Sequence, residues 1–338
     1  MKRNSFPFII LIFFFFIGCT KQENSVLEIK IPHFNKDLTL NSIDSLTLDY
    51  VFKSDNWKIT KDRIFINQWS QDSLLMSFNR ENGKLIEAGI NLGQGPGEYI
   101  VSNPGDAIQD DMMLMYDIMQ RKLFLYKMDQ FTEIEPIEFE LPVDEEGLAL
   151  PSTNITQVSD SIFLLSNDSP SESYWELINL VNGKVLWRKD NEVRKPGQRG
   201  SYYFMQAVTN DRMAVVYKYL PLVQIYRFSD NHTPDIMANY GDAAYINNYN
   251  YKDGDIDTYL SIAVNDNILY CLKAGKENDR GNIVETFDLT NGKPIAILNL
   301  NREVESIRIA PIDKLIGLSP NEKYSRFYIW NIESVHVN

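Results

Sequence analysis

Residues 266–293 have the sequence DNILYCLKAGKENDRGNIVETFDLTNGK, and this stretch contains the two signals that decide the fold. It begins with Asp266-Asn267, where a short carboxylate can bond nearby backbone N–H groups and stabilise a tight turn. It ends with Asn291-Gly292-Lys293, and Asn-Gly is the strongest short hairpin signal because a type I′ turn needs positive φ at both central positions. The apolar runs between the two signals predict β-strands.

The first signal, Asp-x-aliphatic, recurs along the whole chain. Successive copies are about 50 residues apart, which is the spacing of a repeat architecture. The six copies are Asp62-Arg63-Ile64, Asp111-Met112-Met113, Asp160-Ser161-Ile162, Asp211-Arg212-Met213, Asp266-Asn267-Ile268 and Asp313-Lys314-Leu315. We therefore expect six equivalent units, each with a turn that leads into a buried strand.

The second signal recurs as Asn82-Gly83-Lys84 and Asn182-Gly183-Lys184. It follows the clearest apolar run of its unit, which we interpret as the third of four strands. These runs are 74–78, 122–128, 175–180, 223–228, 284–289 and 327–332. Units of four antiparallel strands, repeated radially, are typical of propeller blades. The sequence therefore predicts an all-β fold, a six-bladed β-propeller with four-stranded antiparallel blades.

Closure of the ring can also be predicted. The sixth unit supplies three strands before the chain ends, so it is one strand short. The segment Val26–Ile31 alternates apolar and polar residues, which places Leu27, Ile29 and Ile31 on one face of a strand. We expect this N-terminal strand to close the last blade and lock the ring.

The first residues are typical of an export signal. A short basic start precedes residues 6–17, FPFIILIFFFFI, a run shorter than the roughly 20 residues that a transmembrane helix needs. The run ends at Gly18-Cys19, which resembles the bacterial lipobox, although Phe16 stands where leucine is usual. That resemblance implies cleavage before Cys19 and lipidation of its thiol. An ordinary secretory signal with a chance cysteine is the alternative.

These features divide the chain into three parts: a lipoprotein signal peptide at 1–18, a lipidated tether at 19–25, and a propeller domain at 26–338. More than one acyl chain is needed for stable membrane binding, and lipidation of Cys19 would supply them. We expect the protein to be anchored to the outer membrane, either in the periplasm or exposed at the cell surface.

Charge and cysteine content narrow the choice of partners. Removal of residues 1–18 takes away Lys2 and Arg3, which leaves 31 basic and 46 acidic residues, a net charge of −15. A surface this acidic repels nucleic acid, so we expect no nucleic-acid partner. With Cys19 lipidated, Cys271 is left alone in an apolar run, where it is expected to be a small buried hydrophobe. We expect a monomer.

A glycine-rich string, Gly93-Gln94-Gly95-Pro96-Gly97-Glu98-Tyr99, follows the first unit. Its glycines permit positive φ and Pro96 fixes its own φ, which suits a crossover between blades. The string resembles one found in the six-bladed, TolB-like propeller lipoproteins of the Bacteroidetes. That resemblance implies a fold and a location; it supplies no catalytic residues.

Two groups of residues are candidates for binding. Glu98 and Tyr99 are expected to lead into the next inner strand, where Ser102 and Asn103 would join them at the mouth of the central channel, although the string can equally be turn chemistry alone. Tyr245, Tyr249 and Tyr251 lie in a polar-aromatic stretch that suits binding of a glycan or a protein, or packing between blades.

Markers of catalysis are sparse in the sequence. The three histidines have no histidine or cysteine at metal-ligand spacing, and no G-x-S-x-G string occurs. Glu98, Asn154 and Asp257 have the oxygen ligands that Ca²⁺ or Zn²⁺ could use in a propeller channel. We expect a cell-envelope binding or scaffold module for a protein or glycan, with no cofactor and no catalytic residues. The alternative is a metal-dependent hydrolase or lyase with its site in the channel.

Overall fold

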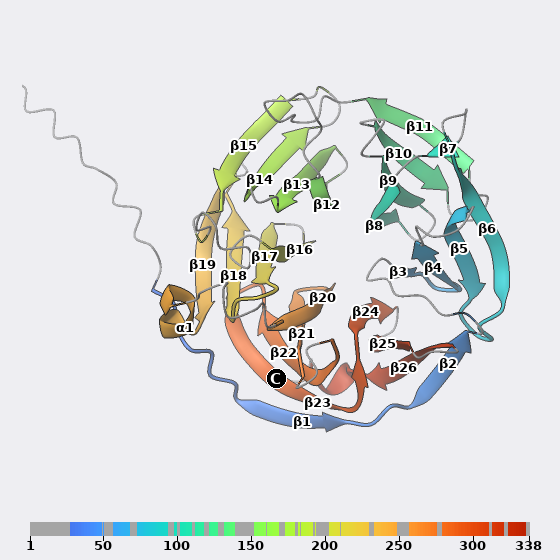
Figure 1. Cartoon of the computed structure of the whole chain (residues 1–338). Helices are drawn as coiled ribbons and strands as arrows, with labels where there is room; N and C mark the ends of the chain where they lie inside the picture. Colours follow the sequence, from blue (N-terminus) through green and yellow to red (C-terminus); the bar gives the residue numbers. More distant parts are fainter. Residues whose placement is uncertain are drawn as a thin grey trace, which may run out of the picture.

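A computed structural model gives the fold. It describes residues 28–48, 50, 57–67, 73–93, 98–99, 102–109, 112–117, 122–127, 132–138, 152–159, 161–168, 173–179, 182, 184–191, 193, 203–209, 211–229, 233–248, 257–275, 279–310, 313–320 and 324–335. Within these residues the strands form six sheets arranged in a ring (Figure 1). The predicted six-bladed β-propeller is therefore confirmed.

Blades 1 to 4 take their strands in chain order from the ring axis outward, and blades 5 and 6 do the same except that the N-terminal strands β1 and β2 form their outer edges. Blade 1 contains β3 (Trp57–Ile59), β4 (Arg63–Asn67), β5 (Ser73–Asn79), β6 (Leu85–Leu92) and β7 (Glu98–Tyr99). Blade 2 contains β8 (Ser102–Gln109), β9 (Met112–Asp117), β10 (Lys122–Lys127) and β11 (Thr132–Glu138). Blade 3 contains β12 (Ser152–Ser159), β13 (Ile162–Asp168), β14 (Ser173–Asn179) and β15 (Lys184–Asp190).

The second half of the ring includes the N-terminal strands. Blade 4 contains β16 (Phe204–Thr209), β17 (Arg212–Tyr217), β18 (Leu222–Phe228) and β19 (Pro234–Gly241). Blade 5 contains β20 (Tyr259–Asn265), β21 (Ile268–Lys273), β22 (Gly281–Asp288), β23 (Lys293–Val304) and β1 (Lys36–Leu40). Blade 6 contains β24 (Ser306–Ala310), β25 (Lys314–Pro320), β26 (Ser325–Asn331) and β2 (Asp44–Leu48).

The Asp-x-aliphatic signals lie where predicted, between the first and second strands of the blades. In every unit the second strand begins one or two residues after the aspartate. Asp266 and Asp313 have φ values of 48° and 50°, a conformation that aspartate tolerates better than most residues because its carboxylate bonds locally. The aspartate therefore makes the turns of blades 5 and 6 compact.

The Asn-Gly turns join the third and fourth strands, but they are not the predicted type I′ turns. Among the described residues, positive φ at these turns occurs only at Gly83 (70°) and Gly292 (72°). Asn82 instead accepts a hydrogen bond from the Lys84 N–H (3.0 Å) through Oδ1. Gly83 N–H donates to the carbonyl of Asn79 (2.8 Å), so the turn spans more residues than a two-residue hairpin.

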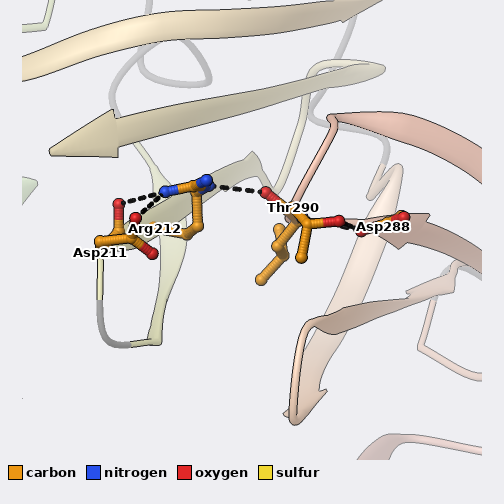
Figure 2. A network of polar contacts seen from close by, with 5 residues as sticks. Asp211, Arg212, Asp288 and Thr290 are labelled. Carbon is orange, nitrogen blue, oxygen red and sulfur yellow. Dashed lines mark hydrogen bonds and ion pairs between the residues drawn. The ribbon is translucent and has the colours of Figure 1, made fainter.

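The glycine of this turn also makes room for the neighbouring blade. A β-carbon at Gly292 would lie 2.9 Å from the Ala238 Cβ of blade 4, and one at Gly83 would lie 2.5 Å from the Thr47 carbonyl of blade 6. A second link lies at the same turn: Arg212 Nε of blade 4 donates to the Leu289 carbonyl of blade 5 (3.1 Å), and Figure 2 shows Arg212 reaching toward the turn that carries Asp288 and Thr290. The repeated turns therefore join each of these blades to the next.

The N-terminal closing strand is confirmed, but its position was predicted incorrectly. The strand that completes blade 6 is β2, which pairs antiparallel with β26 and buries Leu46 and Leu48. Residues 26 and 27 lie outside the described residues, and Lys30 forms only an isolated parallel bridge to Tyr240 of blade 4. Residues 28–48, here called the belt, thus run around the outer rim from blade 4 past blade 5 to blade 6 (Figure 1).

The hydrophobic cores lie between adjacent blades. One described cluster joins Val284 and Leu298 of blade 5 to Ile307 and Trp330 of blade 6, and three others join blades 3 and 4, 4 and 5, and 6 and 1. Cys271 is fully buried in the cluster of blades 4 and 5, as predicted, and burial raises the pKa of its thiol. The thiol is therefore an inert packing group.

Near the ring axis, one side chain connects three blades. Arg308 of β24 donates to the Ser261 Oγ of blade 5 (3.0 Å) and to the Trp57 carbonyl of blade 1 (3.1 Å). Trp57 in turn donates its indole N–H to Ser306 Oγ (2.7 Å). These bonds fasten the first blade to the last on the inside of the ring, while β2 does so on the outside.

Two short helices complete the described structure, α1 (Ala243–Asn248) and a 3-10 helix at Glu333–Val335. Neither these nor any other helix in the described part of the chain is long and apolar enough to cross a membrane.

Candidate functional site

Two faces of the ring differ in their connections. The turn face carries the turns between first and second strands and between third and fourth strands. The crossover face carries the turns between second and third strands and the segments that lead from one blade to the next. The inner strands begin at the crossover face, so residues just before them lie beside the ring axis.

A polar-aromatic cluster lies on this crossover face between blades 4 and 5. Tyr203 precedes the inner strand β16, Lys218 and Tyr219 form the turn between β17 and β18, and Asp257 precedes the inner strand β20. We call these four residues the 4/5 cluster. All four are half-buried, so each presents part of its side chain to solvent.

The backbone of Lys218 holds the cluster together. Its N–H donates to the Tyr203 carbonyl (2.9 Å), and its carbonyl accepts from the N–H groups of Thr258 (2.7 Å) and Tyr259 (3.1 Å). The start of one inner strand, the turn of the same blade and the start of the next inner strand are thus bonded through one residue. This arrangement positions the side chains before any ligand arrives, which lowers the entropic cost of binding.

The side chains form an aromatic pair beside an ion pair. The rings of Tyr203 and Tyr219 meet edge to face, with centroids 5.6 Å apart and an interplanar angle of 82°. Lys218 Nζ lies 5.5 Å from the centroid of the Tyr219 ring and 3.8 Å from Asp257 Oδ2. Apolar ring surface with hydrogen-bonding groups at its edge can stack on a sugar ring and bond its hydroxyls.

A buried network lies beneath this cluster at the start of β20. Tyr259 donates its phenol to Glu285 Oε2 (2.7 Å), and Lys273 Nζ lies 2.8 Å from Glu285 Oε1. Burial, reinforced by the negative charge of Glu285, raises the pKa of Tyr259 well above its ordinary value. The phenol therefore stays protonated and acts as a fixed donor, which suits a structural support.

The structure separates the residues predicted from the glycine-rich string. Ser102 and Asn103 are the first two residues of β8, the inner strand of blade 2, in agreement with a position beside the axis. Glu98 and Tyr99 come two residues before that strand, as expected, but their backbone does not lie beside Ser102 and Asn103 at the channel mouth. They form β7, which pairs parallel with β6 on the outer edge of blade 1 and so satisfies its backbone groups.

Part of the glycine-rich string has a packing reason. A β-carbon at Gly93 would overlap the carboxylate of Glu98, so glycine gives this side chain room to fold back over the chain. Gly95, Pro96 and Gly97 lie outside the described residues. A binding role for the string stays a prediction.

The predicted tyrosine stretch begins on the outer rim of the ring. Tyr245 lies in α1, beside the first described residues of the belt (Figure 1). Its N–H donates to the Asp242 Oδ1 (3.0 Å), which caps the helix. Tyr249 and Tyr251 lie outside the described residues. Tyr245 is therefore far in the fold from Ser102, and the two groups do not form one site.

The candidate metal ligands are also dispersed. Glu98 lies on the outer edge of blade 1, Asn154 on the inner strand of blade 3, and Asp257 beside Lys218 at blade 5. In the described part of the chain, no group of three or more His, Cys, Asp or Glu residues could hold a metal ion.

Lys218 and Tyr219 were not singled out from the sequence. They form a short turn between two apolar strands, and nothing in their spacing distinguishes them from a solvated hairpin. Their neighbours Tyr203 and Asp257 lie in other segments of the chain, so only the fold brings the four together.

The fold defines a six-bladed β-propeller, and comparison with known proteins agrees. The model of the 6-bladed beta-propeller family DUF5128 matches residues 38–309, and the chain belongs to that family. No curated protein matches the chain.

Two solved Bacteroides structures share the fold. One is a Bacteroides fragilis protein described as exported, with 12% identity, a TM-score of 0.54, and coverage of 88% of this chain and 100% of the other. The second is a DUF4221 family member from Bacteroides vulgatus, with 12% identity, a TM-score of 0.52, and coverage of 86% and 97%. At this identity the likeness concerns the fold alone.

Proposed function

We propose that the protein is a cell-envelope lipoprotein, anchored to the outer membrane through Cys19, whose propeller is a non-enzymatic binding module. The observation that carries the binding role is the 4/5 cluster, where two tyrosine rings and a lysine–aspartate pair are held by backbone bonds beside the ring axis. We also propose that the chain is a TolB-like lipoprotein. Its signal peptide would be residues 1–18 and its lipidated tether residues 19–25.

The chemistry of the 4/5 cluster favours a glycan as the partner. Aromatic faces stack on the apolar faces of sugar rings, while Lys218 and Asp257 offer a donor and an acceptor for hydroxyl groups. The acidic surface argues against polyanionic partners. A protein partner is the other outcome that the experiment must be able to detect.

The test is a glycan array probed with the lipidated protein in detergent, with a pull-down from intact cells beside it. We expect binding to selected glycans, reduced at least tenfold by Tyr219→Leu, which keeps apolar packing but removes the aromatic face. Tyr245→Ala, which removes a tyrosine at the outer rim, is the matched control and should bind as the parent does.

The outcomes separate the alternatives. Recovery of a protein partner without glycan binding would mean that the partner of the propeller is that protein and not a glycan. Failure to recover either a glycan or a protein partner would overturn the binding role. Stoichiometric Ca²⁺ or Zn²⁺ in the purified protein would favour the metal-dependent hydrolase or lyase instead.

A further inference from the structure

The belt brings the N-terminal end of the described chain to the outer rim of blade 4. Lys30 N–H donates to the Asn239 carbonyl (2.9 Å), and the Lys30 carbonyl accepts from the Gly241 N–H (2.9 Å). Ile29 packs against the same core cluster as Ile246 of α1. The described residues nearest Cys19 in the chain, 28–31, are thus fixed beside β19 and α1, and not beside blade 6.

Two large apolar side chains are exposed at this rim. Ile31 has an exposed fraction of 81%, and Tyr245 of α1 has one of 39%. They lie on the segment and on the helix whose Ile29 and Ile246 pack into the same core cluster, and Figure 1 shows α1 beside the start of the belt. Isoleucine prefers the acyl boundary of a membrane, and tyrosine is enriched at the headgroup level, where its ring and its hydroxyl face different media.

Covalent geometry keeps this rim close to the lipid. The chain from Cys19 to Glu28 spans at most about 30 Å when fully extended, because each residue contributes about 3.3–3.6 Å. No other rim of the ring is joined so directly to the proposed anchor. The acidic charge of the molecule as a whole opposes contact of its remaining surface with anionic lipid.

We propose that the protein rests on the membrane on the outer rim of blade 4, with Ile31 and Tyr245 at the headgroup region and the ring axis roughly parallel to the bilayer. This inference rests on the proposed anchor at Cys19. In this orientation both faces of the ring point along the membrane surface, so the 4/5 cluster is open to a partner in the envelope.

The test places an environment-sensitive fluorophore at single cysteines in the full lipidated protein. Ile31→Cys and Tyr245→Cys report on the proposed contact. Ile43→Cys and Ile86→Cys are matched controls, because their exposed fractions are 59% and 45% and they lie near blade 6 and on blade 1. Cys271 is buried and stays unlabelled in the folded protein.

The labelled proteins are reconstituted in phosphatidylcholine vesicles, with and without lipids that carry a quencher near the headgroup. We expect quenching at positions 31 and 245 to be at least threefold greater than at positions 43 and 86. Equal quenching at all four positions, on protein that floats with the vesicles, would overturn the orientation and leave the anchor intact.

Flotation and the mass of the mature protein report on the anchor separately. Protein that carries no acyl chains and does not float would overturn the anchor, and the orientation with it. Ile31→Asp offers a second measurement: it should float like the parent but lose the quenching at position 245. Unchanged quenching at that position would contradict a role for Ile31.

Discussion

The turn face and the crossover face of the ring are built on opposite principles. On the turn face, the same short sequences recur from blade to blade, and the Asn-Gly turn of one blade packs against the outer strand of the preceding blade. On the crossover face, the connections range from residues 242–258 between blades 4 and 5 to Glu305 alone between blades 5 and 6.

This difference indicates where stability and binding reside. Repeated turns with positive φ and close approach to a neighbour leave little freedom to vary, because a larger residue would strain the backbone or overlap the next blade. Crossover segments differ in length from blade to blade, so they can bring together side chains such as Tyr203 and Asp257. We therefore expect mutations on the turn face to change stability and those on the crossover face to change binding.

The largest effect is expected from removing the strand on which the turn of blade 1 packs. A truncation that begins at residue 49 removes β2, with the buried Leu46 and Leu48, and leaves Gly83 without its neighbour. Each lost leucine forfeits about 1.5–3 kcal/mol of burial, and blade 6 is left with three strands. Circular dichroism should show no cooperative thermal unfolding.

A shorter truncation is the control for this prediction. A chain that begins at residue 35 keeps β1 and β2 and loses the Lys30 bridge and the packing of Ile29 and Phe34 at the outer rim, so it should be less stable than the parent but still unfold cooperatively. Equal melting of both truncations would contradict the closing role of β2.

The second prediction concerns Gly292→Ala on the turn face. The positive φ alone costs about 1–3 kcal/mol for alanine, and the new β-carbon would also crowd Ala238. Chemical denaturation should show this loss, whereas Lys293→Ala at the exposed next position should show almost none. Adding Ala238→Gly should restore part of the loss; no restoration would mean that crowding between blades contributes nothing.

The third prediction compares one cation on each face. Arg212→Ala removes the bond to the Leu289 carbonyl between blades 4 and 5, which should cost about 1–3 kcal/mol because the donor is charged. Lys218→Ala removes a half-exposed pair with Asp257 at 3.8 Å, which should cost less than about 1 kcal/mol. Denaturant midpoints measure both, and the reverse order would break the contrast between the faces.

The smallest effect is expected inside blade 3, away from both faces. Burial raises the pKa of Glu176, while nearby Arg188 opposes that shift. A raised pKa in the folded state means that stability is fully present below the ordinary value and is lost as pH rises through the folded value. Glu176→Gln should therefore match the parent below pH 4.5 and be slightly more stable at neutral pH, as thermal melts across pH can show. A destabilised variant at neutral pH would contradict the sign.

The sequence was sufficient to predict the repeated four-stranded units, but it was insufficient to predict which N-terminal strand closes the ring. The Asp-x-aliphatic turns and the third strands are local signals, and the structure has them where they were predicted. Both Val26–Ile31 and Asp44–Leu48 alternate apolar and polar residues, so local pattern could not choose between them. The choice depends on which segment reaches β26, and that is a property of the whole ring.

The candidate site was harder to predict for the same reason. Ser102 and Asn103 could be placed beside the axis because they follow a crossover and begin a unit. Glu98 was misplaced because a two-residue strand that pairs parallel with β6 has no signal of its own. Lys218 and Tyr219 form a candidate site only together with Tyr203 and Asp257, which lie before the inner strands of two different blades.

The position of β2 also sets the order of events during synthesis. Its Thr47 bonds Arg326, a residue 279 positions later in the chain. Although β2 is the second strand to be made, it must therefore wait, unpaired, until the last blade has left the ribosome. Contacts this distant in sequence slow folding. The waiting strand is an open edge that another chain could pair with, so a chaperone that shields the nascent N-terminus would raise the yield of closed rings.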